Sequence, residues 1–86
     1  MTHNYIGVGW RAAVLRQLAG LDQMEAAKRS GITLKTWQKM EAGNPCRDAT
    51  IFAVASAFQC SRLWVKYGMD VADNEFAALV TGRARL

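Results

Sequence analysis

The stretch Asp22–Gly43, DQMEAAKRSGITLKTWQKMEAG, holds two short helical signals that are separated by only a few residues. Asp22 can cap a helix, and Glu25 stands three residues later, where a capping-box carboxylate reaches back to the cap. Gly31 is expected to end this first segment, and Thr33 is a good N-cap for the second. A connection of about three residues that includes a glycine is typical of two helices that meet at a steep angle.

Helical signals continue on both sides of this stretch, and no segment alternates apolar and polar residues as a strand would. Asp48 or Thr50 is the expected cap of a helix whose body, IFAVASAF, is apolar nearly all round and is therefore expected to be buried. Ser61 is the expected cap of one further helix, which Gly68 ends. The chain is thus predicted to be all-α, with helices at about 6–19, 23–30, 33–42, 49–58 and 61–67.

The length of 86 residues predicts one domain with a modest core. We place that domain at 1–68 and treat 69–86 as a C-terminal extension, with a candidate sixth helix over 73–81 and a basic tail. One apolar stripe in the extension consists of Phe76, Leu79 and Val80. This stripe can widen a dimer interface, dock on the same chain or bind another protein, and the sequence leaves these three alternatives open.

Composition and charge exclude some classes of protein. The net charge of +4 and the pI near 9.5 are compatible with a polyanionic partner but do not establish one. No apolar run approaches the roughly 18 residues that span a bilayer. The first ten residues lack the basic start and apolar block of a secretory signal, so we expect a cytoplasmic protein, in the bacterial nucleoid or in a host cell if the gene is phage-borne.

The residues that usually carry catalysis or bind metals are scarce. His3 is the single histidine, and Cys46 and Cys60 form no C-x-x-C pair, so we expect no metal, no cofactor and two reduced thiols. The sequence has no glycine-rich phosphate loop and no convergent carboxylates on a helix face. We therefore expect no catalytic residues and no enzymatic activity.

The spacing of many positions taken together resembles the phage repressor and Cro type of helix-turn-helix domain, the XRE-like DNA-binding family. The resemblance covers about Trp10 to Gly68, roughly two thirds of the chain, and it is more specific than a bare helix-turn-helix pattern. The matching positions are LRQLAGLDQ at 15–23, Ala26, Ala27, Gly31, Trp37, Met40, Glu41, Gly43, ASAF at 55–58, and Trp64.

The resemblance implies a five-helix fold of the lambda-repressor type and a sequence-specific regulator of transcription, most often a repressor. Two copies of such a domain bind a palindromic operator as a homodimer, with recognition helices about 34 Å apart. Arg16 and Glu41 match a family ion pair beneath the recognition helix, and Gln23 matches a glutamine that touches a DNA phosphate. The candidate dimer interface is Cys60, Leu63, Trp64 and Tyr67.

The expected recognition helix sorts its side chains by the helical period of about 3.6 residues. One face holds Leu34, Lys35, Gln38 and Lys39, whereas Trp37 and Met40 lie on the opposite face. Lysine suits the acceptors of guanine, glutamine suits adenine, and a leucine can meet the methyl group of thymine. The predicted DNA-binding residues are Gln23, Thr33, Leu34, Lys35, Thr36, Gln38, Lys39, Asn44 and Arg47.

Three positions depart from the family pattern. Ala26 stands where a leucine is usual, and Trp37 where isoleucine or valine is usual. We hypothesise that Trp37 packs over Ala26 and fills the volume of the missing leucine, because cores tolerate exchanges that conserve volume. Leu34 occupies a position that is more often polar, which favours a T-rich half-site, weaker specificity or a protein partner that covers it.

Two other functions stay open at this point. An antitoxin of a toxin–antitoxin pair would have the same fold and bind operators, with the C-terminal extension on its toxin. A neighbouring small reading frame would distinguish it. A protein–protein adaptor would use the fold without DNA and would show no salt-dependent affinity for DNA.

Overall fold

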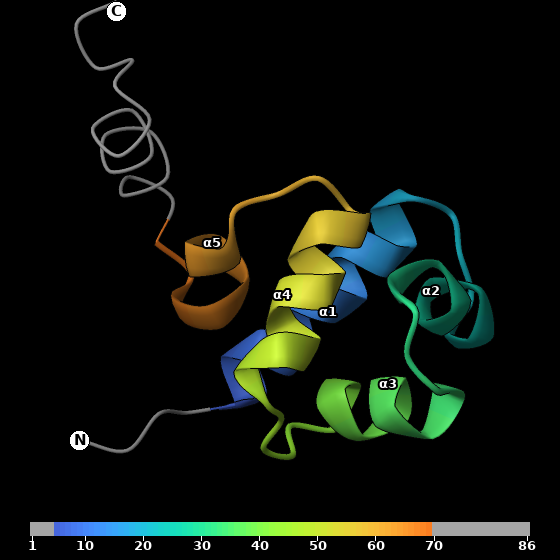
Figure 1. Cartoon of the computed structure of the whole chain (residues 1–86), viewed down its shortest axis with the longest axis horizontal. Helices are drawn as coiled ribbons and strands as arrows, with labels where there is room; N and C mark the ends of the chain where they lie inside the picture. The colour runs from blue at the N-terminus through green and yellow to red at the C-terminus, as the bar shows by residue number, and fades with distance from the viewer. Residues whose placement is uncertain (1–4, 70–86) are drawn as a thin grey trace, which may run out of the picture.

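The computed structural model describes residues 5–69, which form five helices and no strand (Figure 1). The helices are α1 (Tyr5–Leu18), α2 (Gln23–Ser30), α3 (Leu34–Glu41), α4 (Asp48–Ala57) and α5 (Arg62–Tyr67). The predicted all-α class is confirmed, and each helix end lies within one residue of its predicted position. The predicted helix at 73–81, the apolar stripe of the extension and His3 lie outside the described residues.

The local signals around α2 and α3 act as the sequence predicts. The carboxylate of Asp22 accepts a hydrogen bond from the backbone N–H of Glu25 at 2.8 Å, and the Glu25 side chain accepts from the backbone N–H of Asp22 at 2.9 Å. Gly31 adopts the left-handed conformation at φ 72°, which glycine takes without steric cost. Thr33 caps α3 by accepting from the backbone N–H of Thr36 at 3.1 Å. A three-residue turn therefore joins two well-capped helices.

Two predictions about α4 are wrong. Its N-cap is Arg47, which makes no side-chain capping bond, and Asp48 is already the first helical residue. The Asp48 carboxylate instead forms an ion pair with Lys66 at 2.9 Å and so ties α4 to α5. The helix is also not buried all round, since Phe52 remains 37% exposed beneath the guanidinium of Arg62. A cation over an aromatic face makes that partial exposure less unfavourable.

The core lies where the helices converge on α1 and α4 at the centre of the molecule (Figure 1). Gly9 allows α1 to approach the end of α3, because a Cβ there would lie 2.2 Å from the carbonyl oxygen of Met40. Arg11 ties α1 to the end of α5 by donating to the carbonyl oxygens of Val65 and Lys66 at 2.9 and 3.1 Å. The buried apolar residues are Val8, Ala12, Ala26, Ala27, Trp37, Met40, Ile51, Val54, Ala55 and Val65.

Trp37 is a core residue with no exposed surface. Its ring lies 6.1 Å from that of Phe58, centroid to centroid, and the guanidinium of Arg29 covers Phe58 at 4.8 Å. Ala26 is equally buried and belongs to the same cluster, as the volume hypothesis requires. These contacts join α2, α3 and the end of α4 into one packed unit. None of the helices within residues 5–69 is long and apolar enough to cross a membrane.

Candidate nucleic-acid interface

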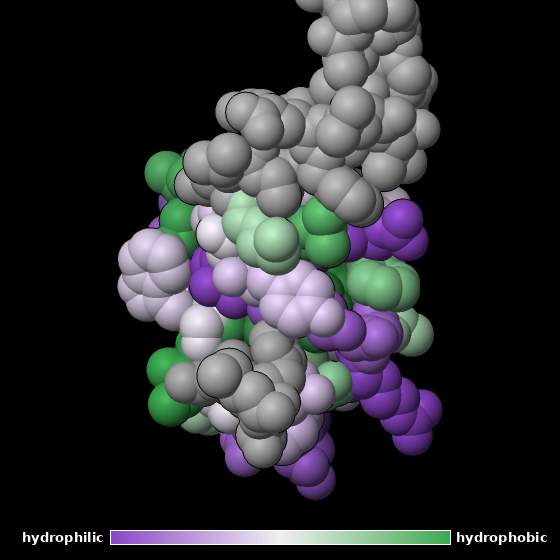
Figure 2. All heavy atoms as spheres, turned by 90° about the vertical axis from the view of Figure 1, so that its left-hand side faces the viewer, coloured by the Kyte–Doolittle hydropathy of each residue, from purple (hydrophilic) through white to green (hydrophobic). Residues whose placement is uncertain are grey.

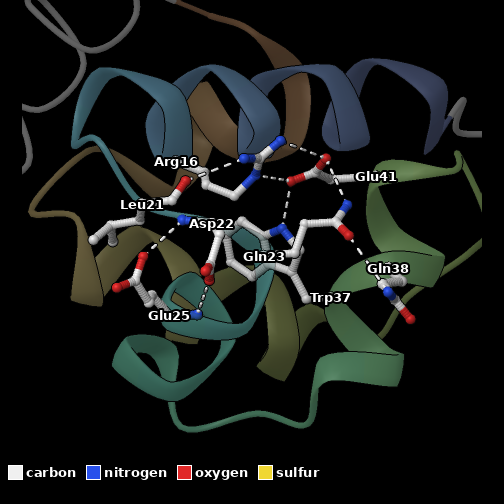
Figure 3. A network of polar contacts seen from close by, with 8 residues as sticks. All are labelled: Arg16, Leu21, Asp22, Gln23, Glu25, Trp37, Gln38 and Glu41. Atoms are coloured by element: carbon white, nitrogen blue, oxygen red, sulfur yellow. Dashed lines mark hydrogen bonds and ion pairs between the residues drawn. The ribbon is translucent and has the colours of Figure 1, made fainter.

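An ion pair beneath α3 connects α1 to the end of that helix (Figure 3). Arg16 Nε donates to Glu41 Oε2 at 2.6 Å and Arg16 Nη2 donates to Glu41 Oε1 at 3.2 Å, a two-pronged arrangement. The two side chains are only 16% and 12% exposed. The remaining Nη1 of Arg16 donates to the carbonyl oxygen of Leu21 at 3.1 Å, which holds the loop before α2. The pair therefore fixes α1, the start of α2 and the end of α3 together.

The Glu41 carboxylate accepts two further hydrogen bonds. The indole Nε1 of Trp37 donates to Oε2, and the side-chain Nε2 of Gln23 donates to Oε1 at 3.0 Å. An ionised carboxylate accepts about four hydrogen bonds, so Arg16, Trp37 and Gln23 together saturate this group. In Figure 3 all three donors point toward Glu41 from α1, α2 and α3 itself. A buried charge that is saturated in this way is a stable anchor for a helix.

The surroundings of Glu41 favour its charged form. Burial raises the pKa of Glu41, but the hydrogen bonds from Arg16, Trp37 and Gln23 outweigh that effect and bring the pKa below its usual value. The hydrogen bond to Glu41 likewise raises the pKa of Arg16. Both groups are therefore charged at neutral pH, and the ion pair is complete there.

The outward face of α3 is polar, as its spacing predicts. Lys35, Gln38 and Lys39 are exposed, whereas Trp37 and Met40 are buried. The predicted residues Leu34 and Thr36 are half-buried, and the Thr33 hydroxyl, at the start of the helix, donates to Thr36 Oγ1 at 2.9 Å. One surface of a short helix thus presents two ammonium groups, an amide and two hydroxyl groups.

Gln23 links this outward face to the buried carboxylate. While its Nε2 donates to Glu41, its Oε1 accepts a long hydrogen bond of 3.4 Å from Gln38 Nε2 (Figure 3). The first residue of α2 therefore lies beside the middle of α3. The predicted role of Gln23 on a DNA phosphate stays a prediction.

The other end of α3 is continuous with a basic groove. Asn44 Nδ2 donates to the carbonyl oxygen of Lys39 at 3.2 Å, and Arg47 is exposed at the start of α4. The groove between α3 and the start of α4 has a volume of about 410 Å³. It is lined by Thr36, Lys39, Met40, Pro45, Cys46, Arg47 and Thr50.

Both cysteines are free thiols. Burial, with a smaller contribution from the charge of Asp48, raises the pKa of the Cys46 thiol. Cys46 therefore lines the groove as an uncharged group at neutral pH. Within residues 5–69, no group of three or more His, Cys, Asp or Glu side chains is arranged to hold a metal ion.

The candidate dimer residues divide into two pairs. Cys60 and Trp64 are half-buried and pack partly against the core of the same chain. Leu63 and Tyr67 instead line a surface groove of about 300 Å³ between α4 and α5, and Tyr67 is 50% exposed. Figure 2 shows the side of the molecule that includes α5, where apolar and strongly polar side chains lie next to one another. The remaining lining residues of the groove are Phe52, Arg62 and Lys66.

Two features of this interface are not predicted by the sequence patterns above. One is the donation from Trp37 to Glu41, although their spacing of four residues places them on one side of a helix. The other is the contact of Gln23 with both Glu41 and Gln38, which depends on how α2 lies across α3. The four-residue spacing of Trp37 and Glu41 could have predicted the first contact, whereas no sequence signal indicates the contacts of Gln23.

No protein-family model, no curated protein and no solved structure matches this chain.

Proposed function

We propose that the protein is a sequence-specific double-stranded DNA-binding regulator of transcription, which acts as a Cro- or CI-type repressor on a palindromic operator. In this proposal α2 and α3 form a helix-turn-helix of the phage repressor and Cro type, and α3 enters the major groove. The observation that carries the proposal is the exposed polar face of α3, which is fixed from beneath by the saturated Arg16–Glu41 pair. A reading surface needs such support, because base recognition depends on accurate placement of side chains.

The charge on this face supports a polyanionic partner. Within residues 5–69, Lys35 and Lys39 form no ion pair, so both ammonium groups are available to phosphates or to guanine. Arg47 adds a third exposed cation at the end of the same surface. Gln38 adds a group that can both donate to and accept from a base edge.

A second copy of the chain completes the proposal. One short helix contacts few base pairs, and a two-fold dimer doubles the site into a palindrome. Leu63 and Tyr67 on α5 line the groove beside α4, and we assign them to the interface between copies together with Phe52 of the same groove. Cys60 and Trp64 support this surface from the core side.

Selection of bound duplexes from a random pool tests the proposal with the full chain. We expect enrichment of a palindrome whose half-sites lie about one helical turn apart, bound with an affinity that falls steeply with salt. A folded protein that enriches no duplex sequence would contradict the proposal. Enrichment of a single half-site would support DNA recognition but contradict binding as a two-fold dimer.

A further inference from the structure

The hydrogen bonds around Glu41 fix which end of the Gln23 amide donates and which accepts, and through Gln23 they fix the same for Gln38 at the surface. An ionised carboxylate only accepts hydrogen bonds, so Gln23 must turn its NH₂ group toward Glu41. Its carbonyl oxygen then points the other way and only accepts. Gln38 must therefore turn its own NH₂ group toward Gln23, as the 3.4 Å contact shows.

The orientation of an exposed glutamine amide is normally free, because its oxygen and nitrogen ends are nearly equal in shape. Here the orientation of the Gln38 amide follows from the charge of Glu41, to which Gln38 is linked through Gln23. Hydrogen bonds from Arg16 and Trp37 keep Glu41 ionised. An ionised Glu41 allows only one orientation of the Gln23 amide, with its NH₂ group toward the carboxylate. Gln38 is then held with its Oε1 free and with one N–H unused.

We infer that Glu41 and Gln23 are positioning residues that orient the amide of Gln38 so that it presents a hydrogen-bond acceptor to the major groove and thereby selects an adenine. This inference rests on the proposed function. An outward oxygen accepts from an exocyclic amino group, and it is repelled by the keto oxygens of guanine and thymine. Adenine, unlike cytosine, also offers N7 to the unused N–H of Gln38, so adenine matches both groups.

The test begins with the operator that the selection yields. Gln38→Ala identifies the base pair that Gln38 reads, since the preference at that position alone should flatten. The adenine there is then replaced by purine, which lacks only the 6-amino group. We expect the full-length protein to bind the purine operator about five- to tenfold more weakly, and Gln38→Ala to bind both operators equally.

The positioning role is tested by the ratio of the two affinities and not by affinity itself. Gln23→Met keeps the length of the side chain but neither donates to Glu41 nor accepts from Gln38. We expect the ratio of adenine to purine affinity to fall toward one in Gln23→Met, even where loss of a phosphate contact weakens both equally. Gln17→Met makes the same exchange at an exposed position on α1 and should leave the ratio unchanged. Gln23→Ala serves as a second variant if Gln23→Met does not fold.

The outcomes separate the two proposals. If the wild-type chain enriches no operator, the proposed function fails. If an operator is enriched but purine binds as well as adenine, or the preferred base bears a keto group toward Gln38, the orientation of Gln38 is overturned. If the adenine preference persists undiminished in folded Gln23→Met and Gln23→Ala, Gln23 is not a positioning residue.

Discussion

Trp37 and Glu41 lie one turn apart on α3, and the buried indole of Trp37 donates a hydrogen bond to the carboxylate of Glu41. The tryptophan thus combines two roles that an aliphatic residue at this position could not. It fills core volume next to Phe58, and it supplies one of the donors that keep a buried charge satisfied.

Trp37→Phe removes the indole donor but retains most of the apolar ring. We expect a loss of about 1–3 kcal/mol in the free energy of unfolding, because one acceptor site of the buried carboxylate is left without a partner. Urea unfolding measures this loss. Trp10→Phe is the matched control, since Trp10 is 64% exposed and its exchange should cost less than about 0.5 kcal/mol. Equal losses of unfolding free energy in the two variants would contradict a stabilising role of the indole N–H.

The volume exchange between positions 26 and 37 predicts coupling between them. In Ala26→Leu the added volume clashes with Trp37, whereas in Ala26→Leu/Trp37→Val the leucine occupies space that the valine vacates. We expect a double-mutant cycle of unfolding free energies to show a favourable coupling of about 1 kcal/mol or more. Additivity of the two single changes would show that Trp37 does not compensate for Ala26.

Removal of one partner of the ion pair should be far more costly here than at the surface. Arg16→Met strands the buried Glu41 charge, and we expect a loss of about 3–5 kcal/mol in the free energy of unfolding. The pair of Lys66 with Asp48 is the internal comparison, because the Asp48 side chain is 55% exposed. Asp48→Asn should cost about 1 kcal/mol or less. Similar losses in both variants would show that burial does not distinguish the pairs.

The same carboxylate predicts a dependence of stability on pH. The pKa of Glu41 is lower in the folded chain than its usual value of about 4.3, so its contribution is complete above that value. That contribution is lost as the pH falls through the lowered pKa of the folded state, because protonation of Glu41 breaks the pair with Arg16. Unfolding free energies measured from neutral pH down to about pH 3 should decline more steeply in wild type than in Glu41→Gln. Parallel curves would argue against a lowered pKa.

Much of the fold is predictable because its signals are local. Asp22 with Glu25, Gly31 and Thr33 each act on the backbone within a few residues, so the bounds of α2 and α3 follow from the sequence. The capping of α4 does not follow, because the expected cap Asp48 lies inside the helix and its carboxylate pairs with Lys66 of α5. The capping at the N-terminus of α4 is therefore determined by contacts between helices and not by the local preference of Asp48 for a cap position.

The candidate site divides in the same way. Helical spacing alone places Lys35, Gln38 and Lys39 on an exposed face and Trp37 in the core. The hydrogen bonds that Gln38 donates to Gln23 and that Gln23 donates to Glu41 require the crossing of α2 and α3, which no sequence pattern predicts. The half-exposed state of Phe52 depends similarly on the placement of Arg62 over its ring.

The most direct test of the proposed DNA interface is a salt titration of operator binding by wild type and by Lys35→Ala/Lys39→Ala. We expect the double variant to remain folded, because both side chains are exposed, and to bind at least about 30-fold more weakly at fixed salt. Lys28→Ala removes an exposed cation outside the proposed interface and should change binding little. Unchanged affinity in the folded double variant would contradict the assignment of α3 as the helix that reads DNA.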